Sequence, residues 1–283
     1  MKAKNLSLFL HNKEVPVDII RFNAGESLVK IDSFFIDPYD VSVKGMITLD
    51  FKSNEDLIDL ALLVDAIKQT TSRNDIKLSL RMSYMPYARN DRVMTLGEPH
   101  ALKVIANFIN SLNFYHVYCD DLHSDVSSAL INNLIHKTQA NCAKDIFYYG
   151  LKPSNTVLVS PDAGANKKVF EFAKTADFAG VVRADKTRDI ATGKLSGTVV
   201  YSEHIGNKDF LILDDILDAG VTFLQLAEKL RPLTTGKIYL YVTHGIFAKG
   251  IDIFHPLIDN IYCYNIMLNN WENKDSHSIL INL

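Results

Sequence analysis

Two hydrophobic patterns alternate along the chain: short, almost continuously apolar runs, and longer segments in which apolar residues recur every three or four positions. The first pattern is typical of strands buried on both faces, and the second of amphipathic helices. In the first half they predict strands at residues 43–51, 76–82 and 115–119, and helices at 54–68, 99–110 and 124–132. Because strands and helices alternate, we expect a mainly parallel sheet with helices on both faces.

The second half of the chain repeats this order. Between residues 138 and 153, polar residues, a glycine and a proline interrupt the periodicity. We therefore predict two α/β domains, residues 1–142 and 143–283, each a mainly parallel sheet flanked by helices. The elements predicted after the boundary are strands at 156–159, from 180 onward, at 210–213 and at 237–243, helices at 167–176 and 222–230, and a hairpin or flap at 193–201.

Composition narrows the class of protein. The net charge is −3, from 30 basic and 33 acidic residues, which gives no bulk attraction to nucleic acid or to an anionic membrane. The three cysteines are far apart and odd in number, which is typical of core thiols in a reducing compartment. The apolar run at the start is too short for a signal peptide, and the one at 57–67 is interrupted by aspartates. We expect a cytoplasmic protein with no membrane or nucleic-acid partner.

Clustered polar residues follow several predicted strands, at the edge where open α/β sheets bind ligands. The strongest cluster begins with Asp214 and Asp215, which end an apolar strand and precede a glycine-containing loop and a helix. Carboxylates there can accept hydrogen bonds from sugar hydroxyls, and backbone N–H groups at the helix start can bind a phosphate. An ordinary polar strand end with a helix cap is the alternative interpretation.

Two further strand ends could bind a metal-bound phosphate chain. His123 follows two carboxylates, and could bind Mg²⁺ or a phosphate, although such a histidine is more often structural. Asp162 precedes a loop of small residues and two lysines, which suits magnesium-bound phosphates. The alternative at Asp162 is a capped helix with a solvated basic first turn.

Two charged segments are also candidates for substrate contact. Residues 84–92 contain two tyrosines and two arginines around an Asn-Asp pair, which could stack on a base and bind phosphates, or could form a salt-bridged loop. Lys186 and Arg188 lie between a predicted strand and the flap, where they could reach an active site. A solvated run of charges is the simpler explanation of that stretch.

In their order and spacing, these segments resemble the motifs of the ribose-phosphate diphosphokinases, the PRPP synthetase family. The resemblance extends from about residue 22 to residue 265. The matching sequences are FNAGE at 22–26 (F-x-D-G-E in the family), YARNDR at 87–92 (Y-A-R-Q-D-R), DLH at 121–123, SPDAG at 160–164 (S-P-D-x-G), KTR at 186–188 (K-R-R), DDILDAGVT at 214–222 (D-D-x-x-D-T-G-G-T) and THG at 243–245.

This resemblance implies two phosphoribosyltransferase-like domains and a Mg²⁺-dependent transfer of the β,γ-diphosphate of ATP to the 1-hydroxyl of ribose 5-phosphate. The products would be PRPP and AMP, and the enzyme would be a homo-oligomer, a dimer or larger, with an adenine pocket shared between subunits. The residues that the resemblance implies are Phe22, Glu26, Arg89, Asn90, Asp91, Arg92 and His123 for ATP; Asp214, Asp215, Asp218, Ala219, Gly220, Val221 and Thr222 for ribose phosphate; His123 and Asp162 for Mg²⁺; and Lys186 and Arg188 for catalysis.

The sequence departs from the family pattern in the phosphate loop. Ala219 replaces a threonine and so removes a hydroxyl donor, and Val221 replaces a glycine where the backbone should approach the phosphate. An acceptor whose 5-phosphate is already esterified, such as ADP-ribose, needs fewer donors, and it is the alternative to ribose 5-phosphate. Ala24 replaces the aspartate of F-x-D-G-E, and both ends of the chain are shorter than in the family, so the family's hexamer and allosteric site are not assumed.

Two further interpretations stay open. A phosphoribosyltransferase shares the fold and the D-D-x-x-D loop but consumes the diphosphate, and the ATP-side motifs at 89–92 and 121–123 argue against it. A regulatory homologue without activity would have no physical need to keep Lys186, Arg188, His123 and Asp162 together.

Overall fold

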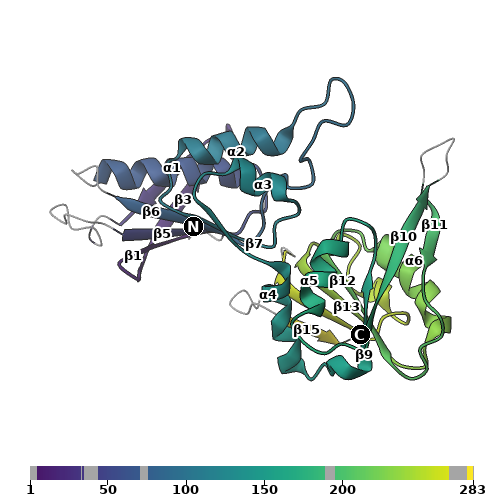
Figure 1. The fold of residues 1–283 in the computed structure, drawn as a ribbon. Coiled ribbons are helices and arrows are strands. Elements are labelled where there is room, and N and C mark those ends of the chain that lie inside the picture. Colours follow the sequence, from purple (N-terminus) through teal and green to yellow (C-terminus); the bar gives the residue numbers. More distant parts are fainter. Residues whose placement is uncertain are drawn as a thin grey trace. The chain divides into compact units, whose positions relative to one another are not determined.

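The computed structural model describes residues 5–32, 34, 44–70, 76–188, 195–267 and 279–282. The chain divides into two compact units, Met1–Lys137 and Thr138–Leu283 (Figure 1). Helix α4 (Gln139–Ala143) packs against elements of the second unit. The boundary between units therefore lies ahead of α4, whereas the sequence analysis put residues 138–142 in the first domain.

The first unit contains a six-stranded sheet in the order β2-β1-β5-β6-β7-β8. The run from β5 to β8 is parallel, while β1 is antiparallel to both of its neighbours. The bounds are β1 (Leu6–Leu10), β2 (Lys13–Val15), β5 (Lys44–Leu49), β6 (Lys77–Met82), β7 (Val117–Asp120) and β8 (Leu134–Lys137), with helices α1 (Glu55–Thr70), α2 (Ala101–Ser111) and α3 (Asp125–Leu130). The described helices and three of the strands match the predicted ones in kind, and β1, β2 and β8 were not predicted.

One face of this sheet forms the core of the unit. Leu8, Ile47 and Leu80 point to it from three neighbouring strands, and the apolar sides of α1 and α2 pack on them. Helix α3 contributes to the same core, so all three described helices cover this one face. The expectation of helices on both faces is therefore wrong for the described part of the first unit. On the other face the strands carry polar side chains such as Arg81 and Asp120, which pair with each other.

The second unit contains a seven-stranded sheet in the order β11-β10-β9-β12-β13-β14-β15, parallel from β10 to β14 and antiparallel at both edges. Helices α4 and α5 pack on one face with Leu158 and Leu211, and α6 packs on the other with Ile212 and Leu240. This unit has the predicted two-sided cover. The bounds are β9 (Thr156–Ser160), β10 (Gly180–Arg188), β11 (Leu195–Val200), β12 (Asp209–Leu217), β13 (Ile238–Gly245), β14 (Asn260–Ile266) and β15 (Ile279–Asn282), α5 (Asn166–Ala173) and α6 (Val221–Leu230), and the short 3₁₀ turns Lys144–Tyr149, Pro153–Asn155, Arg231–Leu233 and Asp252–Phe254.

Strand β12 is longer than the sequence predicted. It pairs with β13 as far as Leu217, but with β9 only as far as Ile212, because β9 ends at Ser160. We expected Asp214 and Asp215 to end the strand. They lie within it instead, beyond the last residue of β12 that pairs with β9. The side of β12 next to these carboxylates is left without a neighbouring strand among the described residues.

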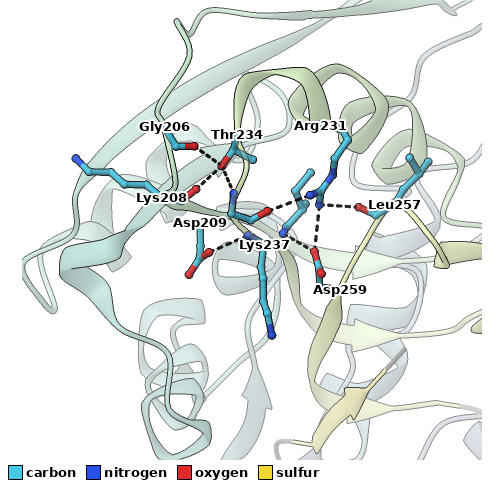
Figure 2. Close-up of polar contacts among 10 residues, drawn as sticks. Gly206, Lys208, Asp209, Arg231, Thr234, Lys237, Leu257 and Asp259 are labelled. Carbon is cyan, nitrogen blue, oxygen red and sulfur yellow. Dashed lines mark hydrogen bonds and ion pairs between the residues drawn. The ribbon is translucent and has the colours of Figure 1, made fainter.

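A polar network ties together the amino ends of β12, β13 and β14 (Figure 2). The buried Thr234 hydroxyl bonds to the carbonyl of Lys208 at 2.5 Å and to that of Gly206 at 3.2 Å, and accepts a hydrogen bond from the Gly236 N–H at 2.8 Å. Arg231 donates to the carboxylate of Asp259 at 3.1 Å. The Thr234 hydroxyl and the Arg231 guanidinium thus join loop groups that are up to 28 positions apart in the sequence.

Cys119, Cys142 and Cys263 are free and buried, as expected for core thiols. Burial raises the pKa of the Cys263 thiol to about 12, so the group is an inert apolar side chain at neutral pH. Within the described ranges, no helix combines the length and the apolar character that a membrane span requires.

We predict that Thr234→Val destabilises the second unit by about 1–3 kcal/mol, because the substitution keeps the shape but removes the buried hydroxyl to which the Lys208 carbonyl and the Gly236 N–H bond. Thr235→Val is the matched control: Thr235 is exposed and its hydroxyl has one bond, to the Gly206 carbonyl at 3.2 Å. Urea unfolding followed by circular dichroism measures both. Equal stability of the two variants would contradict the role given to Thr234.

Candidate functional site

The candidate ribose-phosphate loop runs from β12 into α6. Gly220 has a φ of +77°, and a Cβ at this position would overlap the ring of Phe254. Only glycine therefore fits the turn. The Asp218 carbonyl is held by the Ala248 N–H at 3.0 Å, and α6 begins directly afterwards at Val221. The first N–H groups of a helix have no partner within it, so the turn presents donors suited to an anion.

The two adjacent carboxylates before this loop are held in different ways. The Asp214 carboxylate accepts a hydrogen bond from the Asp215 N–H at 3.0 Å. The Asp215 carboxylate is buried and pairs with Lys168 of α5, with 3.2 Å between Nζ and Oδ2. The sequence analysis named both aspartates but did not predict this pair, which no local pattern encodes.

Asp162 lies in the loop between β9 and α5. Its Oδ1 accepts a hydrogen bond from the Ala165 N–H at 3.1 Å, and its carbonyl accepts one from the Ser160 hydroxyl at 3.0 Å. The carboxylate is partly exposed. This bond holds the loop before α5 and does not cap the helix itself, and the carboxylate can accept further bonds.

In the first unit, a cavity of about 760 Å³ opens beside the YARNDR segment. Arg89 and Asn90, both predicted site residues, line it. The loop that follows β5 also lines the cavity, but the sequence analysis did not name it as part of a site. It lies at the edge of the sheet where the carboxyl ends of the parallel strands meet. The lining residues are Phe51, Lys52, Ser53, Asn54, Tyr84, Tyr87, Arg89 and Asn90.

Hydrogen bonds fix the walls of this cavity. The Tyr87 hydroxyl donates to Asn54 Oδ1 at 2.6 Å, and Tyr87 itself has a positive φ of 60°. The buried carboxylate of Asp56 accepts from the N–H groups of Lys52 and Ser53 at 2.8 and 2.7 Å. Two tyrosine rings, a lysine and an arginine thus face a polar cavity large enough for a nucleotide.

Asp91 links two predicted motifs that are far apart in the sequence. Burial raises the pKa of its carboxyl, but the Ser124 hydroxyl, the Arg92 guanidinium and the charge of His123 stabilise the ionised form more strongly. The net pKa of Asp91 is therefore lowered. Arg92 Nε lies 3.2 Å from Asp91 Oδ1. The structure thus places the D-L-H histidine near the YARNDR segment.

Phe22 and Glu26 lie at the turn of a hairpin formed by β3 (Val17–Arg21) and β4 (Ser27–Ile31). Asp59 of α1 anchors the hairpin, because it accepts two bonds from Arg21, at 2.7 and 2.6 Å, and one from Ser27 at 2.6 Å. Phe22 is half exposed. Neither Phe22 nor Glu26 lines the cavity beside Arg89.

The remaining predicted residues are divided between the two units. His123 belongs to the first unit and Asp162 to the second. In the portion of the chain that the structure describes, no group of three or more His, Cys, Asp or Glu side chains is arranged to hold a metal ion. Lys186 and Arg188 lie in β10, which forms an antiparallel hairpin with β11, but their side chains lie outside the described part.

Comparisons with known proteins agree on one family. The model of the N-terminal domain of ribose phosphate pyrophosphokinase matches residues 3–112. The ribose-phosphate pyrophosphokinase of Pyrococcus furiosus is 28% identical over 253 residues, which cover 88% of this chain and 85% of the relative. That of Mycoplasmopsis pulmonis is 28% identical over 224 residues, covering 78% and 67%. That of Rhizobium meliloti is 30% identical over 203 residues, covering 71% and 63%.

A solved structure supports the fold. The crystal structure of phosphoribosylpyrophosphate synthetase from Mycobacterium smegmatis superimposes with a TM-score of 0.74, over 93% of this chain and 84% of the other. The identity is 18%, so the match is evidence for the fold alone. It confirms the predicted class: two mainly parallel sheets with flanking helices.

We predict that Asp91→Asn lowers the free energy of unfolding at pH 7 and flattens its fall in acid. A carboxyl whose native pKa lies below its ordinary value of 3.8 stabilises the native state when ionised. That contribution is present above the ordinary pKa and is lost as the pH falls through the native value. Urea unfolding between about pH 6 and pH 3 measures the effect. Asp18→Asn, at an exposed position, is the control. If the stability of Asp91→Asn depends on pH as that of the parent chain does, the lowered pKa of Asp91 is refuted.

Proposed function

We propose that the chain is a ribose-phosphate pyrophosphokinase, as its relatives are named, and that it moves the β,γ-diphosphate of ATP to the anomeric hydroxyl of ribose 5-phosphate. The products are PRPP and AMP. The observation that supports this most directly is the sequence of features in β12 and α6: two adjacent carboxylates, the tight turn at Gly220, and a helix start. Carboxylates and helix N–H groups in that order suit a sugar that carries a phosphate.

In the second unit, we assign the ribose hydroxyls to Asp214 and Asp215, which accept hydrogen bonds from them. The 5-phosphate then lies in the loop that follows, against the backbone N–H groups of the first turn of α6. The loop residues in this role are Asp218, Ala219, Gly220, Val221 and Thr222.

In the first unit, we assign ATP to the cavity lined by Arg89 and Asn90. Arg92 and His123 approach the same nucleotide from the neighbouring loops, and Asp91 holds Arg92, with 3.2 Å between Arg92 Nε and Asp91 Oδ1. Tyr84 and Tyr87 offer ring faces to the base or sugar. Phe22 and Glu26 complete an adenine pocket from a second subunit, for which the half-exposed hairpin turn is accessible, so we propose a homo-oligomer.

We assign Mg²⁺ binding to Asp162 in the second unit and to His123 in the first, each judged within its own unit. The partly exposed carboxylate of Asp162 fits the ion, because Mg²⁺ commonly takes one or two protein ligands and completes its shell with substrate phosphates and water. When bound, the ion neutralises charge on the polyphosphate. It needs no cluster of three protein ligands, so the lack of one among the described residues is compatible with this chemistry.

The reaction is an in-line attack of the 1-hydroxyl oxygen on the β-phosphorus of ATP, with AMP as the leaving group. Such transfers depend on positioning and on charge stabilisation. Asp214 and Asp215 fix the ribose so that the 1-hydroxyl is presented for attack. Lys186 and Arg188, in the β10–β11 hairpin, are assigned to the charge that develops on the leaving oxygen. A cytoplasmic location fits the supply of ATP.

One observation favours a second acceptor, ADP-ribose. Val221 is 44% exposed at the first position of α6, where it occupies space above the phosphate loop, and Ala219 offers no hydroxyl. A phosphate that is already a diester carries one charge fewer than a terminal phosphate and needs fewer donors. The same diphosphoryl transfer to ADP-ribose is therefore the alternative activity.

The test is a product assay with Mg²⁺-ATP and either ribose 5-phosphate or ADP-ribose, read by mass spectrometry. Formation of AMP together with PRPP supports the first acceptor. Turnover with ADP-ribose alone supports the second. AMP formation with neither acceptor would overturn both, and consumption of PRPP with a nucleobase would indicate a phosphoribosyltransferase.

We predict that the double substitution Ala219→Thr/Val221→Gly lowers KM for ribose 5-phosphate by about tenfold, which corresponds to one added charge-assisted hydrogen bond of about 1.4 kcal/mol. KM for ATP should stay unchanged, because the loop contacts only the acceptor. Steady-state kinetics with each substrate varied in turn measure both constants. A rise in KM for ribose 5-phosphate would show that the native loop already fits it.

A further inference from the structure

Lys168 and Asp215 form an ion pair between the first turn of α5 and the middle of the sheet, 47 positions apart in the sequence. Lys168 Nζ lies 3.2 Å from Asp215 Oδ2, and the two side chains are 22% and 10% exposed. Both groups are thus largely withdrawn from water, where a charge–charge contact is stronger than on the surface.

The pair is possible because of where β9 ends. Strands β9 and β12 run in parallel register up to Val159 and Ile212. Beyond this point β9 gives way to the loop that leads into α5, and β12 continues through Asp215. Helix α5 packs by Val169 on the face of the sheet that also bears Leu213, two residues before Asp215. Lys168 therefore reaches the carboxylate from the same face.

Asp215 needs such a partner. Its neighbour Asp214 is also a carboxylate, and two like charges on adjacent residues repel each other. The Asp214 side chain accepts a hydrogen bond from the Asp215 N–H at 3.0 Å, so the backbone holds this carboxylate, whereas the Asp215 carboxylate is held by Lys168. A carboxylate has about four acceptor positions. A contact of Lys168 with Oδ2 therefore fixes the group and still permits a hydrogen bond from a substrate hydroxyl.

We propose that Lys168 is a positioning residue for the acceptor: it holds the Asp215 carboxylate in the orientation that hydrogen bonding to the ribose hydroxyls requires. This inference rests on the proposed function. Lys168 acts through Asp215, without contact with the reacting atoms. It should therefore control the affinity for the ribose substrate and leave ATP binding untouched.

The experiment compares Lys168→Met, Lys168→Arg and the control Lys174→Met, the same loss of charge at the exposed other end of α5. Lys168→Met should raise KM for ribose 5-phosphate at least about tenfold, with KM for ATP unchanged and kcat altered less than about threefold. Lys168→Arg should restore most of the affinity, and Lys174→Met should behave like the parent chain. Calorimetric titration with ribose 5-phosphate gives the affinity without turnover.

A double-mutant cycle separates positioning from simple support of the fold. In an Asp215→Asn background, Lys168→Met should change KM for ribose 5-phosphate by less than about twofold, since its route of action is gone. If Lys168→Met changes KM equally in both backgrounds, or lowers the melting temperature with KM unchanged, the positioning role of Lys168 is overturned and the proposed function is not affected. A parent chain that neither binds nor converts ribose 5-phosphate or ADP-ribose overturns the proposed function as well. If only ADP-ribose is converted, the same comparison is made with that acceptor.

Discussion

The placement of two adjacent carboxylates inside a buried strand is the constraint around which the second unit is organised. Asp214 and Asp215 lie in β12 directly after the buried apolar run Phe210–Leu213, and the Asp215 side chain is buried. A charge in such a place is costly unless it is paired. The end of β9 at Ser160 opens space beside them, the Asp215 N–H bonds to one carboxylate, and Lys168 neutralises the other.

The two ends of this sheet have different tasks. At the amino ends of β12 to β14, the side chains of Thr234, Arg231 and Asp259 hold loops together through hydrogen bonds. At the carboxyl ends, the turn at Gly220 and the start of α6 leave backbone donors directed at a ligand. The hydrogen bonds at the amino ends of the strands make that edge of the sheet rigid. Polar groups at the carboxyl ends are therefore not needed to hold the loops there and can bind a ligand.

The first unit uses buried aspartates as anchors for loops. Asp56 holds the loop that lines the cavity, Asp59 holds the β3–β4 hairpin, and Asp91 brings Arg92 and the His123 segment together. Each is paired with a donor at hydrogen-bond distance or by charge, which is the condition for burying it. The loops at this sheet edge are thus positioned by electrostatics, while the apolar core below them supplies the bulk of the stability.

The sequence by itself determined most of the parallel strands, β5 to β7 in the first unit and β9, β10, β12 and β13 in the second, because their apolar runs are nearly continuous. It did not reveal the parallel strands β8 and β14. It did indicate the strand ends where polar motifs gather. The sequence also contains the segments that resemble the motifs of the ribose-phosphate diphosphokinases. Tertiary structure decided the rest. The strands β1 to β4 are short, partly exposed and antiparallel, so their pattern is weak. The extension of β12 depends on its partner β13, and the Lys168–Asp215 pair joins residues that no local periodicity relates. Such features arise from packing between distant segments, and that packing is absent from any short window of the sequence.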